Sequence, residues 1–263
     1  MIKLFRKIRY NLLSEGKTRK YFKYAIGEIV LVVIGILIAL QINTWNENRK
    51  SENYEKTILK EIHTTIKDDL EIFGFLEDRL KKKDTAIDKL ILARQNKVSL
   101  SEDDLLKYIR WSRWGIIFSY NQGPYETLKS SGLDKIKNDS LRFEITNYYD
   151  FTIPRAKSFF DFDKLRYKPL RDIEYKRLKD QGFYEEYFKS IINDNGDEGF
   201  SPRTKYNFDK YLNDPTFNET LLIEANYKNN LWGTLSNLIR RSETLQRILQ
   251  KDLKTRFNMT FHD

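Results

Sequence analysis

The chain has 263 residues, with 47 lysines and arginines against 38 aspartates and glutamates, a formal charge of +9 at pH 7. It contains no cysteine, which excludes disulfides, thiol catalysis, zinc–thiolate sites and iron–sulfur clusters. It contains only two histidines, His63 and His262, which disfavours imidazole metal sites and catalytic triads. Five prolines and eleven glycines are few for this length and disfavour a turn-rich β fold.

Residues 1–23 form a basic leader, with eight lysines and arginines against the single acidic residue Glu15, a net +7. The other 240 residues therefore carry only +2, and the electrostatic footprint expected of a nucleic-acid-binding protein is missing from them. Apolar residues of segment 2–13 fall on one side of a helix whose other side is basic. The leader is therefore either an amphipathic helix on an anionic cytoplasmic leaflet or an unstructured basic tail.

Residues 24–45 are predicted to form a transmembrane helix. Their core, from Ile29 to Leu40, reads IVLVVIGILIAL, and the apolar stretch from Ala25 to Ile42 is about 27 Å long as a helix. A buried core helix and a cleaved signal peptide are the alternatives, and the long basic leader favours an uncleaved anchor. The charge of the leader places the N-terminus in the cytoplasm and residues 46–263 outside. Aromatic residues expected as interfacial anchors flank the span: Tyr21, Tyr24 and Trp45.

The segment after the span is predicted to be one long helix that ends near Lys97. Its apolar residues follow a three-four spacing, interrupted by Asp69 and Lys83: Leu59, Ile62, Ile66, Phe73, Leu76, Leu80, Ile87 and Leu90. Ser101 is the expected N-cap of a second helix, which we predict to continue through an aromatic run: Trp111, Trp114, Phe118 and Tyr120.

Three further helical segments are predicted. Gly123-Pro124 begins a short helix that ends at Gly132, and Asn138 or Asp139 caps a longer segment that reaches about Gln181. Pro154 and Pro169 are expected to kink or break that segment, and residues 193–202 form a loop. A final helix begins after Asp214-Pro215. Its apolar residues form a seam, a row on one side of the helix: Leu231, Leu235, Leu238, Leu245 and Leu249. Ser242 is a lapse in this seam, a polar residue at an apolar position, as Asp69 and Lys83 are in the earlier one. The predicted fold is all-α: one transmembrane helix, then an elongated antiparallel helical bundle over 46–263.

Two stretches carry a family resemblance. Residues 24–47 read YAIGEIVLVVIGILIALQINTWNE, and residues 124–150 read PYETLKSSGLDKIKNDSLRFEITNYYD. Both resemble the signatures of an uncharacterised family of single-pass inner-membrane proteins from flavobacteria and their relatives. The resemblance implies a membrane anchor with an extracytoplasmic helical domain and brings no activity with it. A candidate surface in the second motif comprises Tyr125, Lys129, Ser130, Ser131, Gly132, Asn138 and Arg142.

Glu28 is the most unusual residue of the predicted span, because a carboxylate in a membrane usually faces protein or water. At 100° per residue it shares one face with Gly35 and Ala39, whose small size permits close helix approach. Glu28 therefore either belongs to a contact between membrane helices or extends to the cytoplasmic headgroups beside Lys20 or Lys23.

Other candidate sites give weaker signals. Ser130 and Ser131 have no elbow or serine-lysine signature around them, and a helix that ends at a glycine explains them better. His63 is expected to face solvent. A group of aromatic residues around 150–160 is interpreted as core rather than as a binding surface: Tyr148, Tyr149, Phe151, Phe159, Phe160 and Phe162.

The predicted function is non-enzymatic, since no nucleophile, base or metal-ligand set emerges, and no cofactor is expected. The chain reads as a membrane-tethered interaction, scaffold or sensor-like module, with the lipid bilayer and a protein partner or second copy as its contacts. Two alternatives remain. A subunit of a larger envelope complex would expose a sizeable apolar patch, and a carboxylate-based hydrolase would need two carboxylates about 5–10 Å apart in a cleft.

Overall fold

A computed structural model of the chain describes residue 10 and residues 18–113, 115–180 and 212–261. The chain is all-α, and no strand occurs within these ranges. It divides into two units, residues 1–57 and 58–263, and the division falls inside the first long helix, α2 (Thr18–Arg94). The predicted boundaries at residues 23 and 45 remain predictions.

In the first unit, α2 presents its apolar side chains outward. From Ile26 to Ile42 every large apolar side chain is exposed, and none of the apolar window is buried. This helix is long and apolar enough to cross a membrane. The leader segment 2–13, apart from Tyr10, lies outside the described residues.

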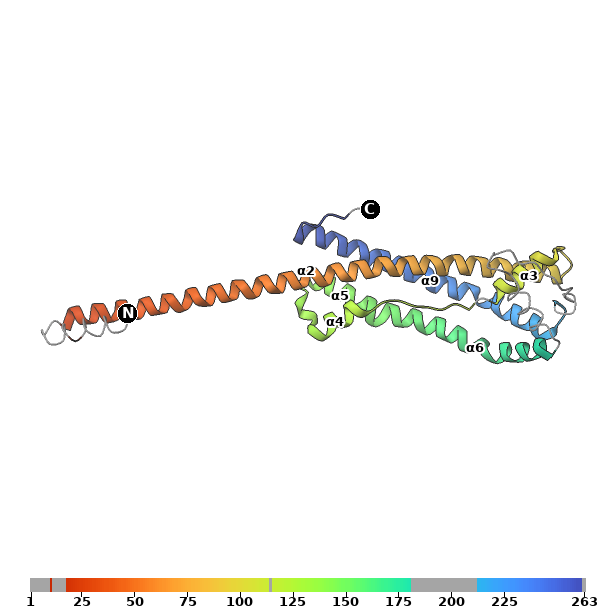
Figure 1. The fold of residues 1–263 in the computed structure, drawn as a ribbon, viewed down its shortest axis with the longest axis horizontal. Coiled ribbons are helices and arrows are strands. Elements are labelled where there is room, and N and C mark those ends of the chain that lie inside the picture. Colours follow the sequence, from red (N-terminus) through yellow and green to blue (C-terminus); the bar gives the residue numbers. More distant parts are fainter. Residues whose placement is uncertain (1–9, 11–17, 114, 181–211, 262–263) are drawn as a thin grey trace, which may run out of the picture. The chain divides into compact units, whose positions relative to one another are not determined.

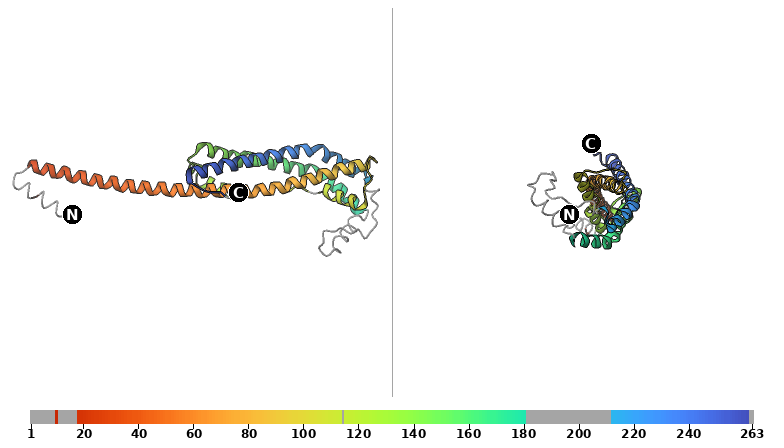
Figure 2. Two further views of the ribbon diagram at one scale, coloured as in Figure 1. Left: turned by 90° about the horizontal axis from the view of Figure 1, so that it is seen from above. Right: turned by 90° about the vertical axis from the view of Figure 1, so that its right-hand side faces the viewer.

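The second unit is a bundle in which the later part of α2 packs with α6 (Ile153–Asp180) and α9 (Pro215–Phe257) (Figure 1). Short helices complete it: α3 (Glu102–Ser112), α4 (Gly123–Ser131), η1 (Leu133–Lys135), α5 (Asp139–Asn147) and the π-helical η2 (Tyr148–Thr152). Helix α9 runs antiparallel to α6 and packs against it (Figure 1 and Figure 2).

Both predicted apolar seams lie in the core. All eight seam residues of α2 and all five of α9 are buried, each at most 7% exposed. A cluster at one end of the bundle joins α2, α3 and α9: Ile87, Leu90, Leu105, Leu106, Ile109, Phe217 and Leu221. Side-chain burial at these positions is the main stabilising contribution to the bundle.

The polar lapses of the seams are buried as well, and each has a specific partner. Asp69 accepts a hydrogen bond from the backbone N–H of Asn121 at 3.0 Å. Lys83 forms an ion pair with Glu224 of α9, with 2.9 Å between Nζ and Oε2. Since an isolated polar group in a core is costly, these contacts restrict the ways in which the helices can pack.

The helix ends follow the predicted caps at Ser101, Asn138 and Gly132, and Asp214 is a further cap. The Ser101 hydroxyl accepts from the N–H of Asp104, and the Asp214 carboxylate accepts from the N–H groups of Thr216 and Phe217. Asn138, rather than Asp139, caps α5, because its side-chain oxygen accepts from the N–H of Leu141. Gly132 ends α4 with a φ of +106°, a backbone conformation that side chains disfavour.

The predicted continuation of the second helix through the aromatic run is wrong. Helix α3 ends at Ser112, and residues 115–122 form an extended segment; Trp114 lies outside the described residues. Gly115 and the β-branched Ile116 and Ile117 disfavour helix there. Extended chain also lets the Phe118 ring stack between Phe73 and Phe160, with ring centroids 5.7 and 5.1 Å apart.

The segment changes from the π-helical turn η2 to α6 just before Pro154, as expected, and α6 is not broken at Pro169; a kink there remains a prediction. Two further expectations need correction. His63 is buried rather than solvent-facing, 8% exposed, with its ring against Phe261. Three of the aromatic residues interpreted as core are exposed: Phe151, Phe159 and Phe162. The predicted loop at 193–202 lies outside the described residues.

Candidate functional site: a groove between α6 and α9

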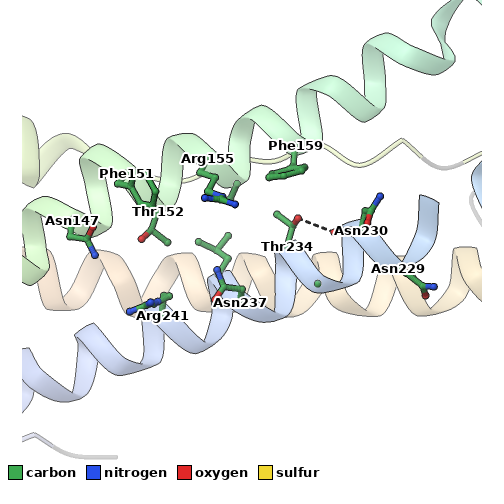
Figure 3. A pocket seen from close by; sticks show the side chains of 13 residues that line it. Asn147, Phe151, Thr152, Arg155, Phe159, Asn229, Asn230, Thr234, Asn237 and Arg241 are labelled. Atoms are coloured by element: carbon green, nitrogen blue, oxygen red, sulfur yellow. Dashed lines mark hydrogen bonds between the residues drawn. The ribbon is translucent and has the colours of Figure 1, made fainter. Parts of the chain in front are cut away.

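A groove of about 610 Å³ lies between the η2–α6 segment and α9. Figure 3 shows Thr152, Arg155 and Phe159 on one wall, directed toward Asn230, Thr234 and Asn237 on the other. The thirteen lining residues comprise four asparagines, two threonines, two arginines, two phenylalanines, an alanine, a glycine and a leucine. This composition is polar and aromatic, and none of these lining residues is acidic.

The first wall is shaped by the π-helical turn η2. Proline has no N–H, so Pro154 cannot donate to the preceding turn, and the N–H of Ile153 bonds to the carbonyl of Tyr148, five residues back. The wider turn buries Tyr148 and Tyr149 and leaves Phe151 and Thr152 at the groove. Arg155 follows one helical turn later, with its guanidinium carbon 5.9 Å from the centre of the Phe151 ring.

The second wall is one face of α9. Its lining residues recur every three or four positions, the spacing that keeps side chains on one side of a helix: Asn229, Asn230, Gly233, Thr234, Asn237, Leu238 and Arg241. At Gly233 this wall is open, since a Cβ atom there would meet nothing within 4 Å. The Thr234 hydroxyl is satisfied by the carbonyl of Asn230.

The groove is electropositive. Arg155 and Arg241 are both exposed, and neither forms an ion pair with any residue in the described part of the chain. The carboxylates nearest in sequence to Arg155 are already engaged, Asp150 with Lys129 and Asp161 with Lys157. Two positive charges therefore face a lining that offers no compensating negative group.

Behind η2, the second sequence motif forms a tyrosine–aspartate cluster. The ring of Tyr125 stacks on that of Tyr149 with centroids 4.6 Å apart, and its hydroxyl donates to Asp150 at 2.7 Å. Lys129 donates to the other carboxylate oxygen of Asp150 at 3.0 Å. Partial burial opposes ionisation of Asp150, but the bonds from Tyr125 and Lys129 hold its pKa below the ordinary value. Burial, reinforced by Asp150, raises the pKa of Tyr125.

The same motif is tied to α9 on the opposite side of the groove. The Tyr148 hydroxyl hydrogen-bonds Ser242 at 2.8 Å, and Ser242 in turn donates to the carbonyl of Leu238. The Asn138 amide donates to Asp252 at 2.8 Å. These bonds fix η2 and α5 against α9, so that the two walls of the groove are held by buried contacts rather than by loops.

The predicted motif surface is split by the structure. Tyr125 is in the core, 1% exposed, while Asn138 and Arg142 are half-buried. Lys129, Ser130 and Ser131 are exposed, and both serine hydroxyls donate to the carbonyl of Thr127. Gly132 caps the helix, and Arg142 donates to the carbonyl of Ile136. A role for these residues as a binding surface remains a prediction.

The residues predicted for the membrane helix lie in the first unit. Glu28 is half-buried, Gly35 and Ala39 are exposed, and a Cβ atom at Gly35 would meet nothing within 4 Å. Tyr24 and Trp45 are exposed, with the Arg49 guanidinium 5.9 Å from the Trp45 ring, and the side chain of Tyr21 is not among those described. Their membrane roles remain predictions, as does the absence of a cofactor.

Sequence reasoning missed the groove residues. Arg155, Asn237 and Arg241 were not singled out, and Phe151 and Phe159 were placed in the core. The available signal was in α9, where Asn229, Gly233, Asn237 and Arg241 recur every four residues along the side of the leucine seam. No group of three histidine, aspartate or glutamate side chains suited to a metal occurs among the described residues.

The chain belongs to a family of unknown function (DUF6090), whose sequence profile matches residues 28–163, just over half of the 263 residues. The match covers most of the predicted membrane helix, the α2 seam, the tyrosine–aspartate cluster and the first wall of the groove, and ends before α9. No curated protein and no solved structure matches the chain.

Proposed function

We propose that the protein is a single-pass membrane protein whose extracytoplasmic helical bundle acts by binding, as an interaction or sensor-like module, and not by catalysis. The observation that carries the proposal is the exposure of the whole apolar stretch from Ile26 to Ile42. A continuous apolar surface that no described residue of the chain covers is stable in a bilayer and costly in water.

The orientation follows from charge. Residues 1–23 carry +7, whereas the segment after Trp45 mixes acidic and basic residues: Glu47, Arg49, Lys50, Glu52, Glu55 and Lys56. Positive flanks are retained in the cytoplasm, so the bundle lies outside, in the periplasm, and the protein resides in the inner membrane.

Binding accounts for the groove better than hydrolysis. A carboxylate-based hydrolase needs two acidic groups about 5–10 Å apart, and the groove lining supplies none. Arginine and asparagine side chains can bind a ligand through charge and hydrogen bonds, and exposed phenylalanine rings can bind it through apolar contact.

A second candidate, a subunit of a larger envelope complex, is favoured by one observation. Phe162, Leu165 and Ile173 of α6 are 60%, 67% and 52% exposed, and on an ideal helix they lie within about 80° of one another. Crosslinking in membranes, followed by purification with the anchor intact, tests this candidate. One stoichiometric partner supports the complex, and recovery of the chain alone or as its own oligomer contradicts it.

The absence of cysteine makes the topology directly testable. Single cysteines are placed in the leader, Ser14→Cys, and on the exposed face of α9, Ser236→Cys, and intact cells are treated with a maleimide that cannot cross the inner membrane. The outer membrane is permeabilised first. We expect labelling at residue 236 before lysis of the inner membrane and at residue 14 only afterwards. The reverse pattern, or recovery of the protein from the soluble fraction, overturns the proposal.

A further inference from the structure

We propose that the groove between α6 and α9 binds an acidic saccharide, with Arg155 and Arg241 recognising its negative groups. The inference deepens the proposed function and rests on it in one respect, that the bundle acts by binding. Its other premises are the charge, the hydrogen-bonding groups and the exposed rings of the groove itself.

The charge of the groove selects an anion. Arg155 and Arg241 lie on opposite walls, on α6 and α9, and in the described residues neither has an acidic partner (Figure 3). Guanidinium groups bind carboxylate, sulfate and phosphate through paired hydrogen bonds. A ligand lying between the walls can therefore meet both guanidinium groups.

The uncharged polar groups select a ligand rich in both donors and acceptors. Four asparagines line the groove: Asn147, Asn229, Asn230 and Asn237. Each amide offers two N–H donors and one carbonyl acceptor, and a saccharide hydroxyl donates and accepts at once. The Asn237 carbonyl oxygen also accepts from Arg240 at 2.8 Å, which leaves its NH₂ group oriented as a donor.

The two phenylalanines of the groove present exposed ring faces on which a ligand can lie. Phe151 and Phe159 are 56% and 44% exposed, one turn before and one turn after Arg155. They stand about 12 Å apart along the helix. Flat, half-exposed rings beside arginine and asparagine suit the apolar C–H face of a sugar ring.

A peptide fits the same groove less well. A helical peptide requires apolar anchor sites at helical spacing, and an extended peptide requires the unpaired backbone edge of a strand. Here the walls are helices whose backbone groups are already bonded, and the sites between the rings are amides and hydroxyls. An acidic peptide is therefore the competing outcome of the test.

The experiment is calorimetric titration of the full chain in detergent micelles with two acidic probes, tetragalacturonate and a chondroitin sulfate tetrasaccharide. Fully methyl-esterified tetragalacturonate is the matched neutral probe, and tetraglutamate represents an acidic peptide. The variants are Arg155→Gln and Arg241→Gln, with Arg247→Gln as control, an exposed arginine of α9 outside the groove. Circular dichroism confirms that each variant keeps its helix content.

We expect at least one acidic tetrasaccharide to bind, with each groove variant weakening it about 10-fold or more, the loss of a charge-assisted hydrogen bond. The control should stay within about 2-fold, and the neutral ester should bind about 10-fold more weakly than its acid. Three results overturn the proposal: neither acidic saccharide binds at millimolar concentration, the control weakens binding as much as the groove variants, or tetraglutamate binds more tightly than both saccharides.

The outcome is separable from that of the topology experiment. If no saccharide binds but residue 236 is labelled from outside, the proposed ligand class is wrong and the proposal of a membrane-anchored module still stands. Arginine-dependent binding with labelling only after lysis keeps the groove as a saccharide site and overturns the periplasmic placement.

Discussion

Asp69 is expected to make the bundle more stable at mildly acidic pH than at pH 8. Its carboxyl group is 1% exposed, one of its oxygens accepts from Asn121, and the other has no hydrogen-bond partner within the described structure. Burial raises its pKa from 3.8 to about 6; the bond from Asn121 opposes the rise, and nearby Asp68 adds to it. Because the folded state holds this proton more tightly than the unfolded state, ionisation of Asp69 opposes folding.

The size of the effect follows from that difference. At 1.36 kcal/mol per pKa unit, the raised pKa corresponds to about 3 kcal/mol. This contribution is fully present below the unfolded pKa and is lost as pH rises through the folded value near 6. Between pH 4.5 and 8 the loss amounts to about 2 kcal/mol, since part of the titration lies below pH 4.5.

Asp69→Asn isolates this contribution, because the amide keeps an acceptor for Asn121 and cannot ionise. We expect the free energy of unfolding of the variant minus that of the wild type to rise by about 2 kcal/mol from pH 4.5 to 8. Urea titrations of the full chain in micelles, followed by tryptophan fluorescence, measure it. Taking the difference cancels other groups, including buried His63, whose lowered pKa has the opposite effect on the pH profile.

The exposed neighbour Asp68 provides the control. Asp68→Asn removes only the smallest contribution to the raised pKa of Asp69, so its difference should change with pH far less than that of Asp69→Asn. The reasoning is refuted if the Asp69→Asn difference changes by less than about 0.5 kcal/mol over this range, or falls as pH rises.

Three further substitutions test the bundle. Lys83→Met should lower the free energy of unfolding by about 3–5 kcal/mol, because it removes the ion-pair partner of the buried Glu224 carboxylate. The double variant with Glu224→Leu should recover most of the loss, measured as the urea midpoint. No recovery would contradict a stabilising role of the ion pair. Ser242→Ala should cost about 1–3 kcal/mol by leaving the Tyr148 hydroxyl buried without an acceptor, and adding Tyr148→Phe should restore stability in thermal unfolding. Gly233→Ala should stabilise α9 by about 0.5–1 kcal/mol, since the new Cβ atom meets open space. A lower melting temperature would show that the added methyl group clashes with a neighbour.

The long helices were predictable because their burial is periodic. The seam from Leu59 to Leu90 and the seam from Leu231 to Leu249 each keep a helical spacing over several turns, and all of these residues are buried. The caps at Ser101, Asn138 and Asp214 are equally local, since a side chain bonds the backbone of its own first turn. Local signals of this kind require no knowledge of what lies across the core.

The lapses in the seams depend on distant residues and could not be interpreted in advance. Asp69 is explained by Asn121, Lys83 by Glu224 and Ser242 by Tyr148, partners that lie between 52 and 141 positions away. The position of each polar residue in an apolar seam therefore correctly predicted that it is buried. The reason why a polar residue stands there could not be predicted, because it depends on a tertiary contact. The extended segment after α3 was missed for a similar reason. Its alternation of Ile116, Phe118 and Tyr120 is short, and a stack between α2 and α6 decides its conformation.

The groove illustrates a different limit, because neither wall alone is unusual. Arg155 between two phenylalanines reads as an ordinary amphipathic helix, and the asparagines of α9 read as a solvated face. Their meaning arises from the antiparallel pairing of α6 with α9, which brings two arginines and four amides into one space without an acid. The pairing in turn depends on the buried hydrogen bond of Tyr148 with Ser242 and on the part-buried one of Asn138 with Asp252. The second sequence motif thus holds the walls of the groove against each other, and apart from Asn147 the groups that would contact a ligand lie in η2, α6 and α9.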